Sequence, residues 1–310
     1  MRIIFFGTPE LALPSLSALA ERHDVAGVVC QPDRPAGRSK KPVAPPVKKW
    51  SDEHGIDTTQ PHKLNDGAFE AWLRAREPEV CALVAYGRLL KQPILDVPRF
   101  GFLNMHPSLL PKYRGPSPIQ SAVLAGETLT GVTIMQIDAG MDSGDILMQK
   151  TLPIDQQDTA GSLSDKLATL GAEMMCVALE SVASGNATYT PQEDTEATFT
   201  KMFKKEDGRI RWADSAVQIQ NLVRAANPWP IAHCGFREKI LRIHEARTVS
   251  GTATMSPGGI EQIASDGIVV ATGEGRLALD VLQFPGKRAL PVAEFMRGHR
   301  LTKDDRLEDI

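Results

Sequence analysis

The feature that most constrains the fold is an alternation of short apolar runs with amphipathic segments over residues 1–189. The apolar runs have the length and composition of buried strands and are Ile3–Phe6, Val25–Cys30, Val80–Ala85, Gly101–Met105 and Val132–Ile137. Segments with helical periodicity separate or follow them, namely Leu11–Ala20, Val43–Glu53, Ala68–Arg76, Ser117–Ala125 and Ser162–Ser184. Strands that alternate with helices are typical of βαβ units. We therefore predict a Rossmann-like, doubly wound α/β sheet, with ligands bound beyond the carboxyl ends of its strands.

The rest of the chain has a different pattern. Polar residues dominate 185–200, and we predict a linker over residues 190–205 between a domain at 1–189 and a second domain at 206–310. After a helical segment, β-type runs separated by Gly-rich turns follow at Ile231–Phe236, Ile240–Val249, Gly259–Ala264, Ile268–Thr272 and Arg276–Leu282. Short strands at this density favour a small β-barrel, of which the OB fold is one type. The pattern alone does not choose between the OB fold and other small barrels.

Composition and motif spacing exclude several classes of protein. The four cysteines lie far apart without a C-x-x-C pair, which is typical of buried thiols in a reducing compartment. The seven histidines also lack metal-ligand spacing, so we predict no metal site. No stretch approaches ~18 uninterrupted apolar residues, which predicts a cytoplasmic protein without a membrane span. Gly7 is not part of a G-x-G-x-x-G fingerprint, so NAD binding is not expected. Nothing indicates a dimer seam, and a monomer is expected.

The charge is unevenly distributed. The net charge of −3 argues against a general electrostatic grip on nucleic acid. Yet six basic residues stand against Asp33 alone between Gln31 and Lys49, and five stand against Glu294 alone within residues 287–303. Such segments can meet a phosphate backbone locally, although solvated surface loops would give the same pattern.

Asn104 and His106 come at the end of an apolar run and are two residues apart, so their side chains share one face of an extended strand. A carboxamide beside an imidazole can stabilise the oxygen of a tetrahedral intermediate and transfer its protons. A later carboxylate can orient the imidazole, and Asp138, Asp142 and Asp145 are all near enough in sequence. The alternative is structural, with the asparagine capping a loop and the histidine satisfied in the core.

The sequence NMHPSLLPKYRG at residues 104–115, followed by AGMDSGD at 139–145, resembles the signature of the folate-dependent formyltransferases. This resemblance implies that Asn104, His106 and Asp142 are catalytic. In formyl transfer, the asparagine would donate to the developing oxyanion and the histidine would donate to it or shuttle the amine proton. The aspartate would stabilise the imidazolium or bind a water that relays the proton.

The resemblance covers most of the chain, from IIFFGTPE at residues 3–10 to about Gly286. QPDRPAGR at 31–38 and RAANPWP at 224–230 are similar to the branch that formylates the α-amino group of initiator methionyl-tRNA. N10-formyltetrahydrofolate is then the expected donor and tRNA the expected partner. The resemblance also favours the OB-like choice for the C-terminal barrel.

Further site residues are implied by the same resemblance. The folate-contacting turn corresponds to Ser108, Leu109, Leu110 and Pro111. A second wall of an apolar slot for the flat pteridine is expected from Val84, Tyr86 and Gly87, although this run also fits a buried strand. The tRNA-contacting loop is expected to use Arg38, Lys40 and Lys41.

Other functions use parts of the same pattern. The catalytic trio could act on the amine of a sugar nucleotide or a ribonucleotide, and a hydrolase releasing formate from the same folate would not need the basic loop. A non-catalytic RNA-binding module with an OB barrel is the alternative from another class. The basic segment at residues 31–49 and the C-terminal barrel favour tRNA, and the Asn104–His106 pair counts against the module.

Overall fold

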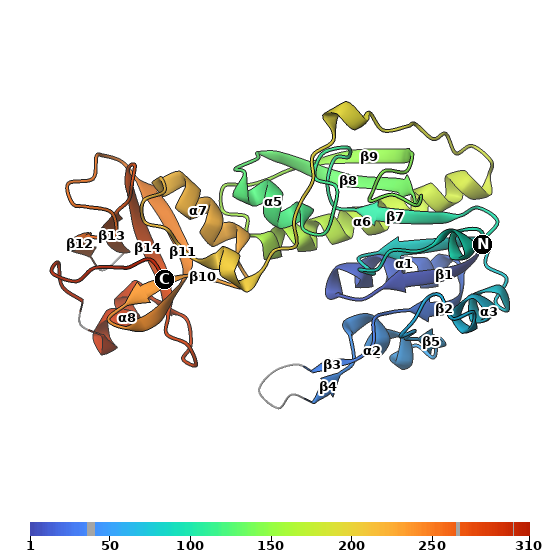
Figure 1. Ribbon diagram of the computed structural model, residues 1–310, viewed down its shortest axis with the longest axis horizontal. Coiled ribbons are helices and arrows are strands. Elements are labelled where there is room, and N and C mark those ends of the chain that lie inside the picture. Colours follow the sequence, from blue (N-terminus) through green and yellow to red (C-terminus); the bar gives the residue numbers. More distant parts are fainter. Residues whose placement is uncertain (36–40, 265–266, 300) are drawn as a thin grey trace. The chain divides into compact units, whose positions relative to one another are not determined.

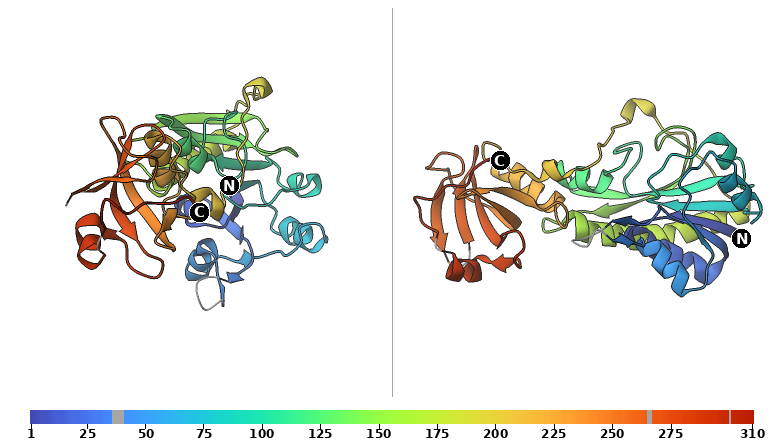
Figure 2. Two further views of the ribbon diagram at one scale, coloured as in Figure 1. Left: turned by 60° about the vertical axis from the view of Figure 1, so that its left-hand side comes forward. Right: turned by 60° about the horizontal axis from the view of Figure 1, so that its bottom comes forward.

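The computed structural model describes residues 1–35, 41–264, 267–299 and 301–310. The chain forms two compact units, which Figure 1 and Figure 2 trace in colours that follow the sequence. Unit 1 comprises Met1–Pro118, Leu129–Pro153 and Ser164–Lys201. Unit 2 comprises Ile119–Thr128, Ile154–Leu163 and Met202–Ile310. Two short segments that precede residue 164 therefore pack with the C-terminal residues.

Unit 1 is built on a seven-stranded sheet in the order β5-β2-β1-β6-β7-β8-β9. Its strands are β1 (Arg2–Gly7), β2 (Asp24–Val29), β5 (Thr58–Thr59), β6 (Val80–Val84), β7 (Phe102–His106), β8 (Leu129–Gln136) and β9 (Ile146–Pro153). The five neighbouring strands β5, β2, β1, β6 and β7 are parallel, whereas β8 and β9 are antiparallel additions at one edge. The predicted Rossmann-like parallel sheet is thus confirmed; the antiparallel edge was not foreseen.

Helices connect or follow these strands. They are α1 (Leu13–Arg22), α2 (Pro46–Glu53), α3 (Ala68–Arg74), α4 (Gln92–Leu95), α5 (Pro118–Leu124) and α6 (Ala160–Ala183), with a 3-10 turn at Glu10–Ala12. The β3 (Arg34–Pro35) and β4 (Pro42–Val43) strands form a separate antiparallel pair. In the described part of the chain, no helix combines the length and apolarity needed to cross a membrane.

The sheet core explains why the apolar runs fold as parallel strands. Every residue of β6 is buried, as is most of β1, because both faces of a parallel sheet are covered. The Phe6 ring packs edge-on against the rings of Phe69, Tyr86 and Phe102, at centroid distances of 6.1, 5.4 and 5.1 Å. Cys30, Cys81, Cys176 and Cys234 are free and buried, as predicted.

Strand β1 lies between β2 and β6, so the strand order reverses at this point. Sheets of this type bind ligands beyond the carboxyl ends of the strands at such a switch point. Gly7 ends β1 here, and a Cβ atom at this position would lie 2.6 Å from the Phe5 ring and 2.8 Å from the Ala12 methyl group. Close packing therefore requires glycine at the turn.

Unit 2 contains an antiparallel sheet in the order β10-β11-β14-β13-β12, with β15 paired to β14. Its elements are α7 (Ala216–Ala225), β10 (Ala232–Phe236), β11 (Lys239–Val249), β12 (Ile260–Ala264), β13 (Gly267–Ala271), β14 (Arg276–Gln283), β15 (Leu290–Pro291) and α8 (Val292–Gly298). Helix α7 begins where Ser215 and Gln218 form a capping box. The predicted second domain of short strands is confirmed as an antiparallel sheet, but the predicted barrel is not confirmed, because within the described residues no pairing of β10 with β12 closes the sheet.

Candidate active site

Strand β7 carries Asn104 and His106 on one face at the centre of the sheet. Asn104 is paired with Leu83 of β6 and Met135 of β8, and His106 is paired with Thr133 of β8. Only 7% of Asn104 and 4% of His106 is exposed. Among the described residues, none forms a hydrogen bond with the Asn104 carboxamide. A buried amide donor without a protein partner is available to a bound substrate.

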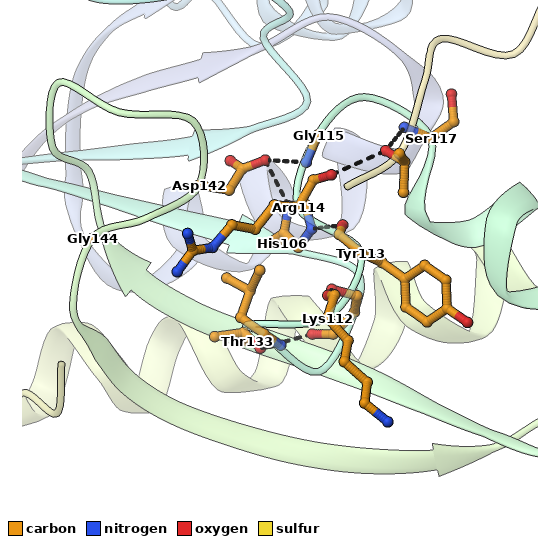
Figure 3. Close-up of polar contacts among 12 residues, drawn as sticks. His106, Lys112, Tyr113, Arg114, Gly115, Ser117, Thr133, Asp142 and Gly144 are labelled. Atoms are coloured by element: carbon orange, nitrogen blue, oxygen red, sulfur yellow. Dashed lines mark hydrogen bonds and ion pairs between the residues drawn. The ribbon is translucent and has the colours of Figure 1, made fainter. Parts of the chain in front are cut away.

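The His106 imidazole is held by the backbone of the following loop (Figure 3). Its Nε2 lies 2.9 Å from the carbonyl oxygen of Tyr113, and its Nδ1 lies 3.6 Å from Oδ2 of Asp142. Because a carbonyl oxygen can only accept, Nε2 carries the hydrogen in the neutral ring and Nδ1 presents its lone pair. In this neutral tautomer, Nδ1 is the ring nitrogen that can accept a proton.

Burial lowers the pKa of His106 below its ordinary value of 6.5, while the Asp142 charge and the Tyr113 carbonyl act in the opposite direction. The desolvation effect dominates because a charged imidazolium is poorly solvated inside the unit. Burial therefore favours the neutral form of the imidazole. A neutral imidazole can accept a proton during the reaction, and the nearby carboxylate then stabilises the resulting cation.

Asp142 is fixed on the loop between β8 and β9. Its Oδ2 accepts a hydrogen bond from the Gly115 backbone N–H at 2.7 Å (Figure 3), and its backbone has a left-handed φ of 51°. The Asp138 carboxylate has different hydrogen-bond partners. Asp138 accepts hydrogen bonds from the Gly140 N–H and from the Ser143 hydroxyl within the same turn. Of the three aspartates, the structure places Asp142 beside the histidine.

The turn at Ser108, Leu109, Leu110 and Pro111 is held within the unit by its own polar groups. The Ser108 hydroxyl donates to the Lys112 carbonyl at 2.7 Å. The Thr133 hydroxyl donates to the Ser108 carbonyl at 2.7 Å and accepts from the Leu110 N–H at 3.1 Å. These bonds make the turn a rigid wall after His106. Contact with a ligand would use its partly exposed apolar groups, on Leu109 and Pro111.

The second run implied by the resemblance lies at the end of β6, beside the switch point. The side chains of Val84 and Tyr86 are buried in the core. The Tyr86 carbonyl accepts hydrogen bonds from the Thr8 hydroxyl at 3.4 Å and from the Gln31 amide at 3.0 Å. Gly87 follows with a left-handed φ of 78°. Val84 and Tyr86 thus lie in the core at the end of β6, and Gly87 is the member of the run with an unhindered surface.

Of the three residues expected to contact tRNA, the structure describes one. Arg38 and Lys40 lie outside the described residues, whereas Lys41 is exposed immediately before β4. Among the residues that are described, no cluster of His, Cys, Asp or Glu could hold a metal ion.

Residues 198–200 belong to the site, which the sequence did not indicate. The Tyr113 N–H donates to the Thr198 hydroxyl at 2.8 Å, and the Arg114 N–H donates to the Thr198 carbonyl at 2.8 Å. The Thr200 N–H donates to the Arg114 carbonyl at 2.7 Å. Polar composition suggested a linker here, and no hydrophobic periodicity marked these pairings. The segment supports the loop whose carbonyl holds the His106 ring.

Comparison with known protein families assigns this chain to the formyl transferases. Residues 1–179 match the family described as "Formyl transferase", and residues 202–300 match "Formyl transferase, C-terminal domain". The chain belongs to the formyl transferase family. A relative from Pelotomaculum thermopropionicum named methionyl-tRNA formyltransferase is 45% identical over 96% of both chains. One from Roseiflexus castenholzii with the same name is 44% identical over 99% of both chains.

Solved structures share the fold at lower identity. HypX from Aquifex aeolicus, crystallised in complex with tetrahydrofolic acid, has a TM-score of 0.66 and 20% identity over 96% of this chain. This chain spans 47% of the length of HypX. The sugar 3N-formyl transferase WlaRD has a TM-score of 0.67 and 18% identity over 93% of this chain and 99% of its own. Both likenesses concern the fold.

Replacement of Asp142 by asparagine is expected to lower kcat about tenfold, equivalent to roughly one pKa unit of lost imidazolium stabilisation. The Asp142 charge raises the pKa of His106, so its removal lowers that pKa further. Below the pKa of a free α-amine, about 7.7–8.0, log kcat/KM falls with decreasing pH. The fall in log kcat/KM with decreasing pH becomes steeper once His106 is protonated as well. In the variant this steepening should occur at lower pH, as a pH–rate series will measure.

Asp138→Asn is the matched control, because Asp138 lies on the same loop and bonds within its own turn. It should leave both kcat and the pH profile close to those of the unmodified protein. A larger loss of kcat in Asp138→Asn than in Asp142→Asn would assign the carboxylate role to Asp138 instead.

Proposed function

We propose that this chain transfers a formyl group from N10-formyltetrahydrofolate to the α-amino group of initiator methionyl-tRNA, producing formylmethionyl-tRNA for translation initiation in the cytoplasm. The observation that carries the proposal is identity of 41–45% along almost the entire chain to relatives named methionyl-tRNA formyltransferase. The site geometry supports it, because an unpaired carboxamide, a neutral imidazole and a carboxylate are the groups that acyl transfer to an amine requires.

The chemistry assigns one role to each side chain. The neutral amine attacks the formyl carbon, and the carbonyl oxygen becomes an oxyanion that accepts a hydrogen bond from the Asn104 amide. The amine proton passes to Nδ1 of His106, and Asp142 stabilises the imidazolium. Collapse of the intermediate breaks the bond from the formyl carbon to N10, and the His106 imidazolium transfers its proton to the leaving N10. The Tyr113 carbonyl keeps the ring oriented throughout, because its bond to Nε2 does not change.

For the folate, we propose the crevice beyond the carboxyl ends of the central strands. Ligands of doubly wound sheets bind there. The apolar groups of Leu109 and Pro111, backed by Ser108 and Leu110, would form one wall of the slot for the pteridine. Gly87 would form the other, with Val84 and Tyr86 behind it. No metal takes part in this proposal.

For the tRNA, we propose two basic regions and the C-terminal β unit, which we assign as OB-like. OB folds frequently bind oligonucleotides on a curved antiparallel sheet. The region of Arg38, Lys40 and Lys41 follows strand β3, and the second region lies within residues 287–303. Local cations of this kind would supply the phosphate contacts that the net charge of −3 does not. The protein is proposed to act as a monomer.

Replacement of Arg38, Lys40 and Lys41 together by alanine tests the basic loop. Each lost phosphate contact should reduce the slope of log K against log salt by about 0.7–0.9, and affinity for tRNA should fall. Thermal stability and folate affinity should hardly change, since exposed charges contribute little to folding. The measurement is tRNA binding at a series of salt concentrations. An unchanged slope and affinity would remove this loop from the tRNA site.

The activity itself is tested by incubating the protein with N10-formyltetrahydrofolate and charged initiator tRNA, and separating products on acid gels. A sugar nucleotide bearing a free amine is assayed in parallel, and release of formate is measured without any acceptor. Formylated tRNA as the dominant product is expected. Preferential formylation of the sugar amine, or formate release independent of acceptor, would overturn the proposal.

A further inference from the structure

The Gln192 side chain joins two loops of the candidate active site. Its Nε2 donates to the carbonyl oxygens of Asp142 at 2.9 Å and Gly144 at 2.7 Å, and its Oε1 accepts from Nε of Arg114 at 3.0 Å. Both amide hydrogens and the amide oxygen are therefore used. The two carbonyl groups lie on either side of Ser143, so the carboxamide holds the aspartate loop at two points.

Arg114 is the anchor for this bridge. Only 4% of the residue is exposed, and its Nη2 donates to the Asp194 carboxylate at 2.8 Å. Its backbone is paired on both sides with residues 198–200. A side chain buried and bonded in this way has little freedom to move. Figure 3 shows Arg114 between Tyr113 and Gly115 on the loop beside His106.

Arg114 stands in the chain between the two residues whose backbone groups hold His106 and Asp142. The residue before it, Tyr113, holds Nε2 of His106 through its carbonyl, and the residue after it, Gly115, holds Oδ2 of Asp142 through its N–H. Gln192 then ties the backbone of Asp142 to the guanidinium of Arg114. Both His106 and Asp142 are thus positioned by the same short segment of backbone, Tyr113 to Gly115.

The backbone of Asp142 needs such support. Its φ of 51° lies in the left-handed region, which aspartate adopts more readily than most residues but less readily than glycine, and which is retained when the surroundings fix it. The hydrogen bonds from Gln192 restrain this backbone directly. Without them the loop could relax and change the 3.6 Å separation between the carboxylate and His106.

We propose that Gln192 is a positioning residue for formyl transfer, which fixes the Asp142 carboxylate beside His106 through its bonds to the aspartate loop and to Arg114. The proposal rests on the proposed function for the reaction that it supports. It assigns no substrate contact to Gln192. Among the described residues, Asp142 is the charged group that faces the imidazole, and Arg114 and Asp194 are the charged members of the supporting network.

The test combines Gln192→Ala and Gln192→Met, the second of which keeps the side-chain length without hydrogen bonds. NMR titration of the His106 imidazole in the protein without substrates should show a lower pKa in both, because the Asp142 charge is no longer held nearby. With substrates, kcat should fall by up to about tenfold, no further than in Asp142→Asn, with little change in KM, because Gln192 acts through the same carboxylate. Glu193→Ala is the matched control and should change neither quantity, since among the described residues the Glu193 carboxylate bonds to Thr195.

A double-mutant cycle separates positioning from general support of the fold. In an Asp142→Asn background, Gln192→Ala should lower kcat less than about twofold further, because neighbours in one network are not additive. An unchanged His106 titration, or the full loss of kcat repeated in the Asp142→Asn background, would overturn the proposal. The titration needs no acceptor. If the unmodified protein failed to formylate tRNA, the proposed function would fall while the titration still decided the role of Gln192 in the His106–Asp142 geometry.

Discussion

Replacement of His106 by alanine is expected to lower kcat by about 10²–10⁴-fold, the typical contribution of a general acid–base group. The variant loses Nδ1, the nitrogen that faces Asp142 and takes the amine proton in the proposed reaction. Binding of folate should be little affected, because the imidazole acts on the reacting atoms. Single-turnover kinetics with saturating substrates measures the chemical step directly.

His233→Ala provides the matched control for this experiment. His233 is also buried, and its Nδ1 lies 2.9 Å from a backbone carbonyl, that of Ile231, so alanine removes a similar volume and a similar hydrogen bond. It belongs to unit 2 and is proposed to have no role in the chemistry. Both variants should lose some thermal stability, but His233→Ala should keep kcat within about threefold. A folded His106→Ala variant with near-normal turnover would exclude His106 from the mechanism.

The central sheet could be predicted because burial on both faces leaves a direct trace in the sequence. Strands β1, β2, β6 and β7 are short apolar runs, and their order along the chain is enough to indicate βαβ units. Strand β9 left no such trace. It lies at the sheet edge, most of its residues are exposed or half-buried, and its sequence ILMQKTLP mixes polar with apolar side chains.

Packing between distant segments was also invisible in the sequence. Residues 119–128 and 154–163 lie between segments of unit 1 in the sequence, yet they pack with the C-terminal residues in unit 2. A pattern of apolar residues shows that a segment is buried, but it does not show against what. The same applies to β15 and α8, whose short lengths give too few residues for a period to emerge.

Some features of the candidate active site could likewise be predicted from the sequence, and others could not. The shared face of Asn104 and His106 follows from strand periodicity, and both are buried on β7. The choice among three aspartates does not follow from spacing, because it depends on how the 139–145 loop folds back to the Gly115 N–H. Gln192 stands far from these residues in sequence and in a polar stretch. Its role required the three-dimensional contacts.

Replacement of Asn104 by alanine should lower kcat by about 10²–10³-fold, the usual cost of removing one donor to an oxyanion. The carboxamide is buried and without a hydrogen-bond partner among the described residues, so its loss breaks no bond that supports the fold. Thermal stability should therefore change little. The expected signature is a fall in kcat with an unchanged KM for folate, because the bond strengthens only as charge develops on the oxygen.

Asn104→Asp sharpens this prediction. The carboxylate has nearly the shape of the carboxamide but carries negative charge to the place where the oxyanion forms, so it should lower kcat at least as much as alanine does. Asn186→Ala is the matched control, since Asn186 is an exposed asparagine that bonds to the neighbouring Ser184 hydroxyl. It should leave kcat unchanged. If Asn104→Ala instead raised only the KM for folate, Asn104 would be a folate-binding residue, and another donor would have to stabilise the oxyanion.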